Sequence, residues 1–268
     1  MFQKLIRKLE RNFLGKDPLY QDPYNEPAEQ YYARIYLKYL FEKIDSEFRH
    51  QRIKILDLGC HTGRLSIPLA RAGHQVIGID SSRFHVKRAE HHAKEAGVSC
   101  RFLAGDGFRF VGRQADESFD LVLSTEVLYQ RPEFRQDMAS LLRILRAGGL
   151  LATSHRTRFF YLSRAIRERN FEMAEFILHQ SEGELWGSYF NWQTPSDLKE
   201  IYRELSADLL LLRPIGILTG NGADGMAALC DLGKMGPEER ERLSSIEAGE
   251  TDEFAAIGRY LFAIGRKR

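Results

Sequence analysis

Short apolar runs alternate with segments of helical periodicity through most of the chain after Arg52. The runs have strand length and are Ile53–Leu58, Gln75–Ile79, Cys100–Leu103, Phe119–Ser124 and Gly149–Ser154. The segments between them that predict helices are Arg64–Ala72, Ser82–Ala96 and Glu133–Leu145. Two later runs, Ala207–Leu212 and Arg259–Ile264, can supply the last strands. This alternation indicates βαβ units and therefore an α/β fold, with a mostly parallel sheet and helices on both faces.

The first fifty residues have a different pattern. Phe2 to Phe13 has one apolar face and a basic remainder, a proline-punctuated linker follows, and a second, Tyr-rich helix is expected from Ala28 to about Phe48. We therefore expect an N-terminal helical extension at 1–50 and one domain at 51–268. The first helix could rest on an anionic membrane surface, but packing on its own domain or on a partner subunit is favoured, which would suit a homodimer.

Two segments interrupt the strand–helix alternation, and both leave from strand ends. Residues 156–193 hold nine aromatic side chains between Arg156 and Trp192, and residues 216–257 begin with several glycines. Since an open parallel sheet binds ligands at its strand ends, we expect both segments to act as lids, the first of them helical.

Composition narrows the class of protein. With 39 Lys+Arg and 37 Asp+Glu the net charge is 39 − 37 = +2, which argues against broad nucleic-acid affinity. No apolar run reaches the roughly 20 residues of a membrane span, and the first residues do not resemble a signal peptide. Three dispersed cysteines fit a reducing compartment. We expect a cytoplasmic protein with no metal site, because no Cys or His pair has ligand spacing.

The strongest motif follows the first predicted strand: Asp57-Leu58-Gly59-Cys60-His61-Thr62-Gly63. A glycine turn between a strand and a helix lets a ligand approach the backbone. The dinucleotide fingerprint would need glycines at 61 and 64, where this chain has His61 and Arg64. The second strand ends in Asp80, 21 residues after Gly59, where a carboxylate can accept both ribose hydroxyls of a nucleoside.

Two further strand ends add polar groups. Gly105-Asp106-Gly107 follows the third strand, and Thr125 to Tyr129 follows the fourth. Four strand ends are thus expected to meet on one ligand. Each acid also has a structural interpretation: Asp57 as a helix cap, Asp106 as a turn residue, and Asp80-Ser81-Ser82 as a helix start.

These residues resemble the class I S-adenosylmethionine-dependent methyltransferases of the small-molecule type, which includes quinone-biosynthesis enzymes. The matching elements are ILDLGCHTG, VIGID, AGDG, FDLVLSTEVL and LLRILRAGGLL, in order over about Lys54–Leu151. The resemblance implies S-adenosylmethionine as cofactor and a Rossmann-like seven-stranded sheet whose last strand, Arg259–Ile264, runs antiparallel.

The resemblance also implies residue roles. Asp57, Gly59, Cys60 and Gly63 would surround the methionine part of the donor, with Ser124 offering a carbonyl and Tyr32 approaching the methionine carboxylate. Asp80 with Ser81 would hold the ribose, and Asp106 with Gly107 the adenine.

The acceptor is predicted only as a class. The fourth strand is followed by STEVL and not by the D/N-P-P-Y/F of nucleobase amino-methyltransferases, so a small molecule is favoured, with transfer most often to oxygen. A protonated oxygen benefits from a general base, for which His155 at the end of the fifth strand is the candidate, while Glu126 and Tyr129 face the expected pocket. The aromatic side chains of 156–193 could wall the acceptor pocket or simply pack a helical cap.

Three alternatives stay open. An RNA or protein methyltransferase would need a basic patch, which only the N-terminal helix or the arginines after Arg156 could supply. A nonenzymatic S-adenosylmethionine-binding partner protein would carry the same motifs. An NAD-dependent oxidoreductase is disfavoured by His61 and Arg64.

Overall fold

A computed structural model describes residues 27–219, 231–249 and 252–268. The predicted helix at Phe2 to Phe13, the proline-punctuated linker and Cys230 lie outside the described residues. The second predicted helix is present as α2 (Pro27–Phe48). In the described part of the chain no helix is both long and apolar enough to cross a membrane.

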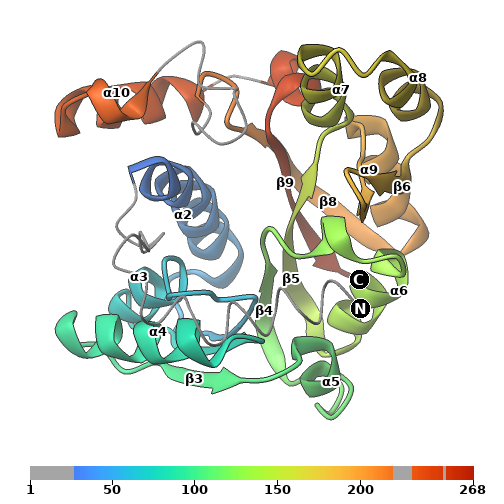
Figure 1. Cartoon of the computed structure of the whole chain (residues 1–268). Coiled ribbons are helices and arrows are strands. Elements are labelled where there is room, and N and C mark those ends of the chain that lie inside the picture. Colours follow the sequence, from blue (N-terminus) through green and yellow to red (C-terminus); the bar gives the residue numbers. More distant parts are fainter. Residues whose placement is uncertain (1–26, 220–230, 250–251) are drawn as a thin grey trace.

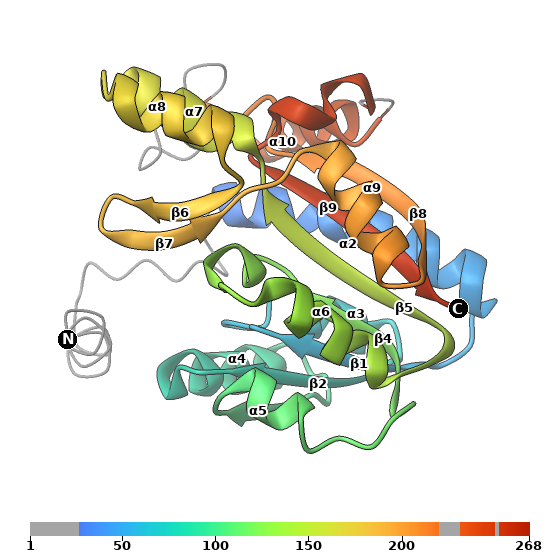
Figure 2. The ribbon, with the colours of Figure 1, turned by 90° about the vertical axis from the view of Figure 1, so that its right-hand side faces the viewer.

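Within the described residues, seven strands form one twisted sheet in the order β3-β2-β1-β4-β5-β9-β8 (Figures 1 and 2). The strands are β1 (Lys54–Leu58), β2 (Gln75–Asp80), β3 (Arg101–Ala104), β4 (Phe119–Ser124), β5 (Leu145–Arg156), β8 (Ala207–Ile215) and β9 (Tyr260–Lys267). β9 pairs antiparallel with both β5 and β8, and the pairs among β1 to β5 are parallel. The expected Rossmann-like sheet with an antiparallel last strand is confirmed.

Helices cover both faces because successive strand residues point to opposite sides. Leu121 of β4 packs in the core under α2, whereas Val122 packs in the core on the other face. The helices between strands are α3 (Ser66–Arg71), α4 (Arg83–Glu95), α5 (Gly107–Val111), α6 (Phe134–Arg143) and α9 (Pro195–Glu204). α2 and α3 contribute to the first core, and α5, α6 and α9 contribute to the second.

Several element boundaries differ from the sequence prediction, and β8 and β9 each end three residues beyond the predicted bounds. β5 begins at Leu145, which pairs with Phe119, so the helix predicted over Glu133–Leu145 ends at Arg143. α5, at five residues, is too short to show helical periodicity, and it was not predicted.

The aromatic segment after β5 is only partly helical. It contains α7 (Arg158–Arg167), α8 (Phe171–His179) and a hairpin of β6 (Glu182–Leu185) and β7 (Ser188–Asn191). Trp192 and Phe160 are buried in a small core of their own between these elements. In Figure 2 the hairpin lies on the side toward which the parallel strands point.

The second irregular segment, residues 216–257, packs against α2 through its described parts. Its described parts are the 3₁₀ turns Leu232–Lys234 and Asp252–Ile257 and the helix α10 (Pro237–Glu247), which contacts α2. The Tyr31 hydroxyl of α2 donates to the buried Glu247 carboxylate at 2.9 Å.

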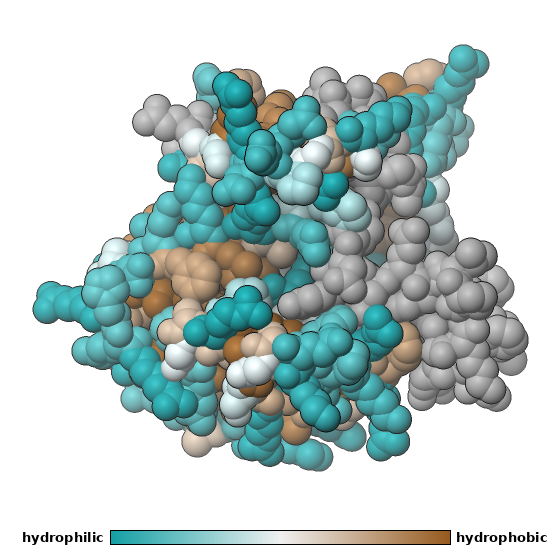
Figure 3. Space-filling view, turned by 90° about the vertical axis from the view of Figure 1, so that its left-hand side faces the viewer, coloured by the Kyte–Doolittle hydropathy of each residue, from teal (hydrophilic) through white to brown (hydrophobic). Residues whose placement is uncertain are grey.

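Apolar side chains gather on the face of the molecule that carries α2, as Figure 3 shows. A shallow groove there is lined by Ala33, Leu37 and Phe41, with Arg34 and Lys38 also in its lining. This groove is distinct from the cavity described next, although Arg64 contributes to both.

Candidate active site

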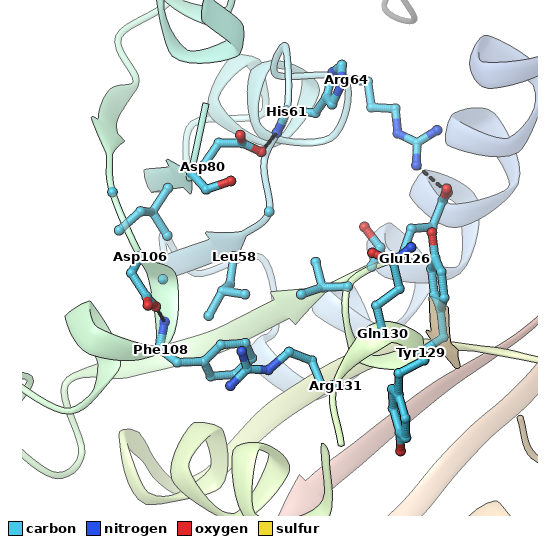
Figure 4. Close-up of a pocket in the computed structure, with 18 of the residues that line it drawn as sticks. Leu58, His61, Arg64, Asp80, Asp106, Phe108, Glu126, Tyr129, Gln130 and Arg131 are labelled. Carbon is cyan, nitrogen blue, oxygen red and sulfur yellow. Dashed lines mark hydrogen bonds and ion pairs between the residues drawn. The ribbon is translucent and has the colours of Figure 1, made fainter. Parts of the chain in front are cut away.

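A cavity of about 710 Å³ lies at the carboxyl ends of β1 to β4. Residues that the sequence placed in the site line it: Gly59, Asp80, Ser81, Asp106, Gly107, Glu126 and Tyr129. They come from four separate strand ends, and Figure 4 shows Asp80 and His61 on one side of the cavity and Glu126, Tyr129 and Arg131 on another. As expected, four strand ends meet at one cavity.

The glycine turn after β1 needs its glycine. Gly59 has φ +83°, and a Cβ there would lie 2.4 Å from Cγ2 of Val127. His61 adopts φ +48°, and its backbone N–H donates to Oδ2 of Asp80 at 3.1 Å. A side chain at position 61 is therefore tolerated, since the turn is tied to the end of β2.

Asp80 is held as a carboxylate. Its Oδ1 accepts the Ser82 backbone N–H at 2.8 Å and lies 3.4 Å from Nδ1 of His85. Burial opposes ionisation, but the hydrogen bonds from His85 and the Ser82 backbone keep the pKa of Asp80 below its usual value. An ionised carboxylate is the form that accepts hydrogen bonds from hydroxyl groups.

Asp106 both lines the cavity and caps a helix. It lines the cavity, and its Oδ1 caps α5 by accepting backbone N–H groups of Phe108 at 2.9 Å and Arg109 at 3.1 Å. The Phe108 ring is covered by the Arg131 guanidinium at 4.3 Å. Gly107 is required for packing, because a Cβ there would lie 2.8 Å from Cγ of Leu58.

A charged clamp forms another wall of the cavity. Arg64 pairs with Glu29 of α2 and with Glu126, and all three side chains are largely buried. The Tyr260 hydroxyl donates to Oε2 of Glu126 at 2.7 Å. Burial opposes ionisation of Glu126, but Arg64 and the Tyr260 hydroxyl keep its pKa below the usual value. The sequence analysis did not predict this role of Arg64; the available signal was a charged residue directly after the glycine motif.

Four residues predicted at the methionine part do not line the cavity: Asp57, Cys60, Gly63 and Ser124. All four lie on or beside the strand ends, and Asp57, Cys60 and Gly63 pack beneath the glycine turn. Ser66 donates to Oδ2 of Asp57 at 2.6 Å, and burial raises the pKa of Asp57 to about 6. Burial also raises the pKa of the Cys60 thiol. Gly63 has φ +91°, with Cδ1 of Ile67 at 2.9 Å from where its Cβ would be.

The position of His155 does not favour the predicted role of general base. Its ring is fully buried away from the cavity lining, with Nε2 2.9 Å from the Thr153 hydroxyl and Phe134 edge-on. Burial lowers its pKa to about 3, so it stays neutral. The physical reason is strand alternation: His155 points to the opposite face of β5 from Ser154, whose hydroxyl accepts the Glu126 backbone N–H.

Tyr32 is also buried outside the cavity lining, and its hydroxyl donates to the Thr219 carbonyl at 3.3 Å. Two residues of the hairpin, Ser188 and Tyr189, do line the cavity, although no motif marked them. The segment after β5 thus contributes to the cavity through the hairpin of β6 and β7, and not through α7 or α8.

Comparison with known proteins agrees with this geometry. A family model described as a methyltransferase domain matches residues 49–204. The ubiquinone biosynthesis O-methyltransferase of Rhizobium etli is 37% identical over 107 residues, which is 39% of this chain and 42% of that protein. The enzyme of the same name from Rickettsia felis is 30% identical over 147 residues, 54% of this chain and 57% of that one. The chain therefore spans about two-fifths to three-fifths of these relatives.

Solved structures show the same fold. The magnesium protoporphyrin IX methyltransferase of Synechocystis PCC 6803, solved with bound SAH, has a TM-score of 0.60 at 13% identity, and the match covers 99% of each chain. At that identity the likeness concerns the fold alone. Because the family model covers more than half of the chain, the protein belongs to the methyltransferase domain family, and its resemblance to class I methyltransferases is confirmed.

Proposed function

We propose that the protein transfers the methyl group of S-adenosylmethionine to an oxygen atom of a small-molecule acceptor. The observation that carries the proposal is the cavity in which an ionised Asp80, the capping Asp106 and the Gly59 turn come together from three strand ends. The names of the Rhizobium etli and Rickettsia felis relatives support oxygen as the methylated atom.

The volume and the lining of the cavity both suit S-adenosylmethionine. Its volume of about 710 Å³ is within the range of sites for ligands of this size, about 300–1,000 Å³. Gly59 and Gly107 line the cavity at positions where Val127 and Leu58 leave no room for a Cβ, and Asp80 presents a carboxylate to a nucleoside ribose. We infer that Asp80 and Ser81 hold the ribose, and that Asp106 and Gly107 lie at the adenine.

Methyl transfer from a sulfonium is an in-line displacement, so alignment and exclusion of water supply much of the rate. Glu126 is a poor proton acceptor in its present state, because both of its oxygens are engaged and its pKa is lowered. We infer that Glu126 and Tyr129 orient the reactants. The hairpin carrying Ser188 and Tyr189 would act with residues 216–257 as a cover for the acceptor.

Calorimetric titration with S-adenosylmethionine and S-adenosylhomocysteine, with NAD as a control ligand, tests the cofactor. We expect micromolar binding of the first two. In Asp80→Asn the charge-assisted hydrogen bonds to the ribose are lost, and the Kd should rise about 10- to 150-fold.

The matched control is Asp116→Asn, since Asp116 is an exposed carboxylate paired with Arg143 on the surface. It should leave the Kd unchanged. Absence of binding to the wild-type protein, or tighter binding of NAD, would contradict the proposal.

Two broader expectations belong to the same proposal. We propose that the protein works in the cytoplasm, a location that its free cysteines Cys60 and Cys100 suit. We also propose a homodimer, on the strength of the amphipathic pattern between Phe2 and Phe13. Light scattering on the purified protein, with residues 1–26 present or removed, tests the second of these.

A further inference from the structure

Arg156 is a buried cation at the carboxyl end of β5. The residue is 8% exposed, and its guanidinium is surrounded by aromatic rings. Its Cζ lies 4.0 Å from the ring centroid of Tyr260, 4.2 Å from that of Phe160 and 5.0 Å from that of Tyr129. Cation–π attraction compensates part of the cost of burying the charge, but it leaves the N–H groups of the guanidinium unsatisfied.

Arg156 lacks the hydrogen bonds that a buried arginine needs. Its Nε and Nη1 are buried and have no hydrogen-bond partner in the part of the chain that the structure describes. Arg64 gives the contrast, because it is paired with two carboxylates. Glu126 attracts Arg156 electrostatically, but its oxygens are engaged by Arg64 and by the Tyr260 hydroxyl.

A second buried donor lies close by. Tyr161 is 2% exposed, and its hydroxyl has no hydrogen-bond partner among the described residues. Burial raises the pKa of Tyr161, although Arg156 acts against that rise, so the hydroxyl is protonated and can donate. Arg259 adds positive charge, with its Cζ about 5.5 Å from the Phe160 ring and 5.6 Å from the Tyr260 ring. The unsatisfied groups are donors and the local charge is positive, so the group that would satisfy them is an oxyanion.

These donors lie directly behind the cavity wall. Tyr129 lines the cavity, and its ring is also part of the cage around Arg156. Figure 4 shows the Tyr129 side chain extending away from Asp80 and His61, the end that we assign to the nucleoside. Its ring stacks on Phe190 of the hairpin at 6.4 Å. Arg156 is not itself among the residues that line the cavity, so a ligand reaches it only past the Tyr129 ring, which separates the two.

We propose that Arg156 and the Tyr161 hydroxyl bind an oxyanion of the methyl acceptor, so that the acceptor is a phenol carrying a carboxylate or phosphate. This inference rests on the proposed function. The buried guanidinium holds the anionic end, which orients the hydroxyl of the acceptor toward the donor. The aromatic side chains around Arg156, Tyr129 and Phe160 among them, suit an aromatic acceptor.

The test measures ligand binding in the presence of saturating S-adenosylhomocysteine. The probes are hydroxybenzoate, its neutral counterpart hydroxybenzamide, and hydroxyphenyl phosphate, titrated by calorimetry into the wild-type protein and into Arg156→Gln. We expect at least one of the two anions to bind the wild-type protein about 10- to 150-fold more tightly than the amide, because a desolvated guanidinium discriminates by charge. Which anion binds identifies carboxylate or phosphate as the natural group. In R156Q the preference should vanish.

Two further variants separate binding from folding. Tyr161→Phe keeps the ring and loses only the hydroxyl, so it should weaken the anion several-fold without affecting S-adenosylhomocysteine. Arg164→Gln is the matched control, because Arg164 lies on α7 and stacks on Trp186 at a partly exposed position. It should bind the probes like the wild-type protein.

The outcomes are distinct from those of the proposed function. If S-adenosylhomocysteine does not bind the wild-type protein, the proposed function fails. If it binds while neither anion binds better than the amide, or while the preference persists in R156Q, Arg156 is satisfied by water or by its aromatic rings alone and the present inference is overturned.

Discussion

The carboxyl group of Asp57 lies buried beneath the glycine turn, where the Ser66 hydroxyl donates to it. Burial raises its pKa to about 6 from the ordinary value of 3.8, so at neutral pH the fold carries a buried charge that the unfolded chain would expose to water. Since the folded-state pKa is raised, this group lowers the stability of the fold as the pH rises from about 4 to about 6, and the loss is complete above that.

Asp57→Asn removes that charge and keeps an oxygen for Ser66. We expect the variant to be more stable than the wild-type protein at pH 7.5, by about 1–3 kcal/mol, and to gain about 1–1.5 kcal/mol less at pH 5. Urea unfolding at the two pH values measures both numbers. An equal gain at both pH values would contradict the raised pKa, and Asp116→Asn, at an exposed position paired with Arg143, should show no such gain at pH 7.5.

The strand ends predicted correctly which acids line the cavity, whereas the face to which His155 points depends on its position in the alternation along β5. Asp80 and Asp106 were found because an acid directly after a parallel strand lies at the ligand-binding edge. His155 satisfied the same rule in the sequence, but its side chain points to the face covered by α6 and α9. Neighbouring residues of a strand point to opposite faces of the sheet, so an error of one residue assigns a side chain to the wrong face. The sequence around Ser154 to Arg156 contains no apolar alternation that would show which face His155 occupies.

At the scale of the element, the clamp of Glu29, Arg64 and Glu126 ties α2 to the ends of β1 and β4. α2 covers one face of the sheet and begins at Pro27, two residues before Glu29. The clamp therefore fixes the first turn of the helix beside the cavity, and Arg64 pairs with both carboxylates there.

Arg64→Met should leave two largely buried carboxylates without their cation. We expect the variant to lose about 3–5 kcal/mol of stability, and the amides of the first turns of α2 to exchange faster with deuterated solvent than those near Phe48. Arg71→Met, at an exposed position on α3, is the control and should change neither. Unchanged exchange at the start of α2 would show that apolar packing alone holds the helix.

Prediction of elements was limited by length and by periodicity. β2, β4 and α4 were predicted within one residue of their bounds, because their apolar spacing extends over the whole element. The longer β5 was predicted from Gly149 although it begins at Leu145. The hairpin of β6 and β7 was missed because Glu182-Gly183-Glu184 has no apolar alternation and gains its order from packing against Phe176 and Trp192. That hairpin brings Ser188 and Tyr189 to the cavity, so a missed element also meant missed site residues.

The cavity belongs to the whole molecule, because its walls come from segments far apart in the chain: α2 through Glu29, four strand ends, and the hairpin through Ser188. A ligand that contacts all of these segments binds only when they are folded together, so its binding stabilises the whole fold. The opposite edge of the sheet, where β8 pairs with β9 and α9 packs, contributes no residue to the cavity lining.

S-adenosylhomocysteine at 100 times its Kd should stabilise the folded state by about 2.7 kcal/mol. For a chain of this length that corresponds to a rise in Tm of about 5–10 °C. Hydrogen exchange should slow at the Gly59 turn, at residues 105–108 and at the start of α2, and it should change little in α9 and β8. NAD at the same concentration should have no effect. Protection confined to α9 and β8 would place the ligand at the wrong edge of the sheet, and no rise in Tm would mean that the ligand does not bind the folded state.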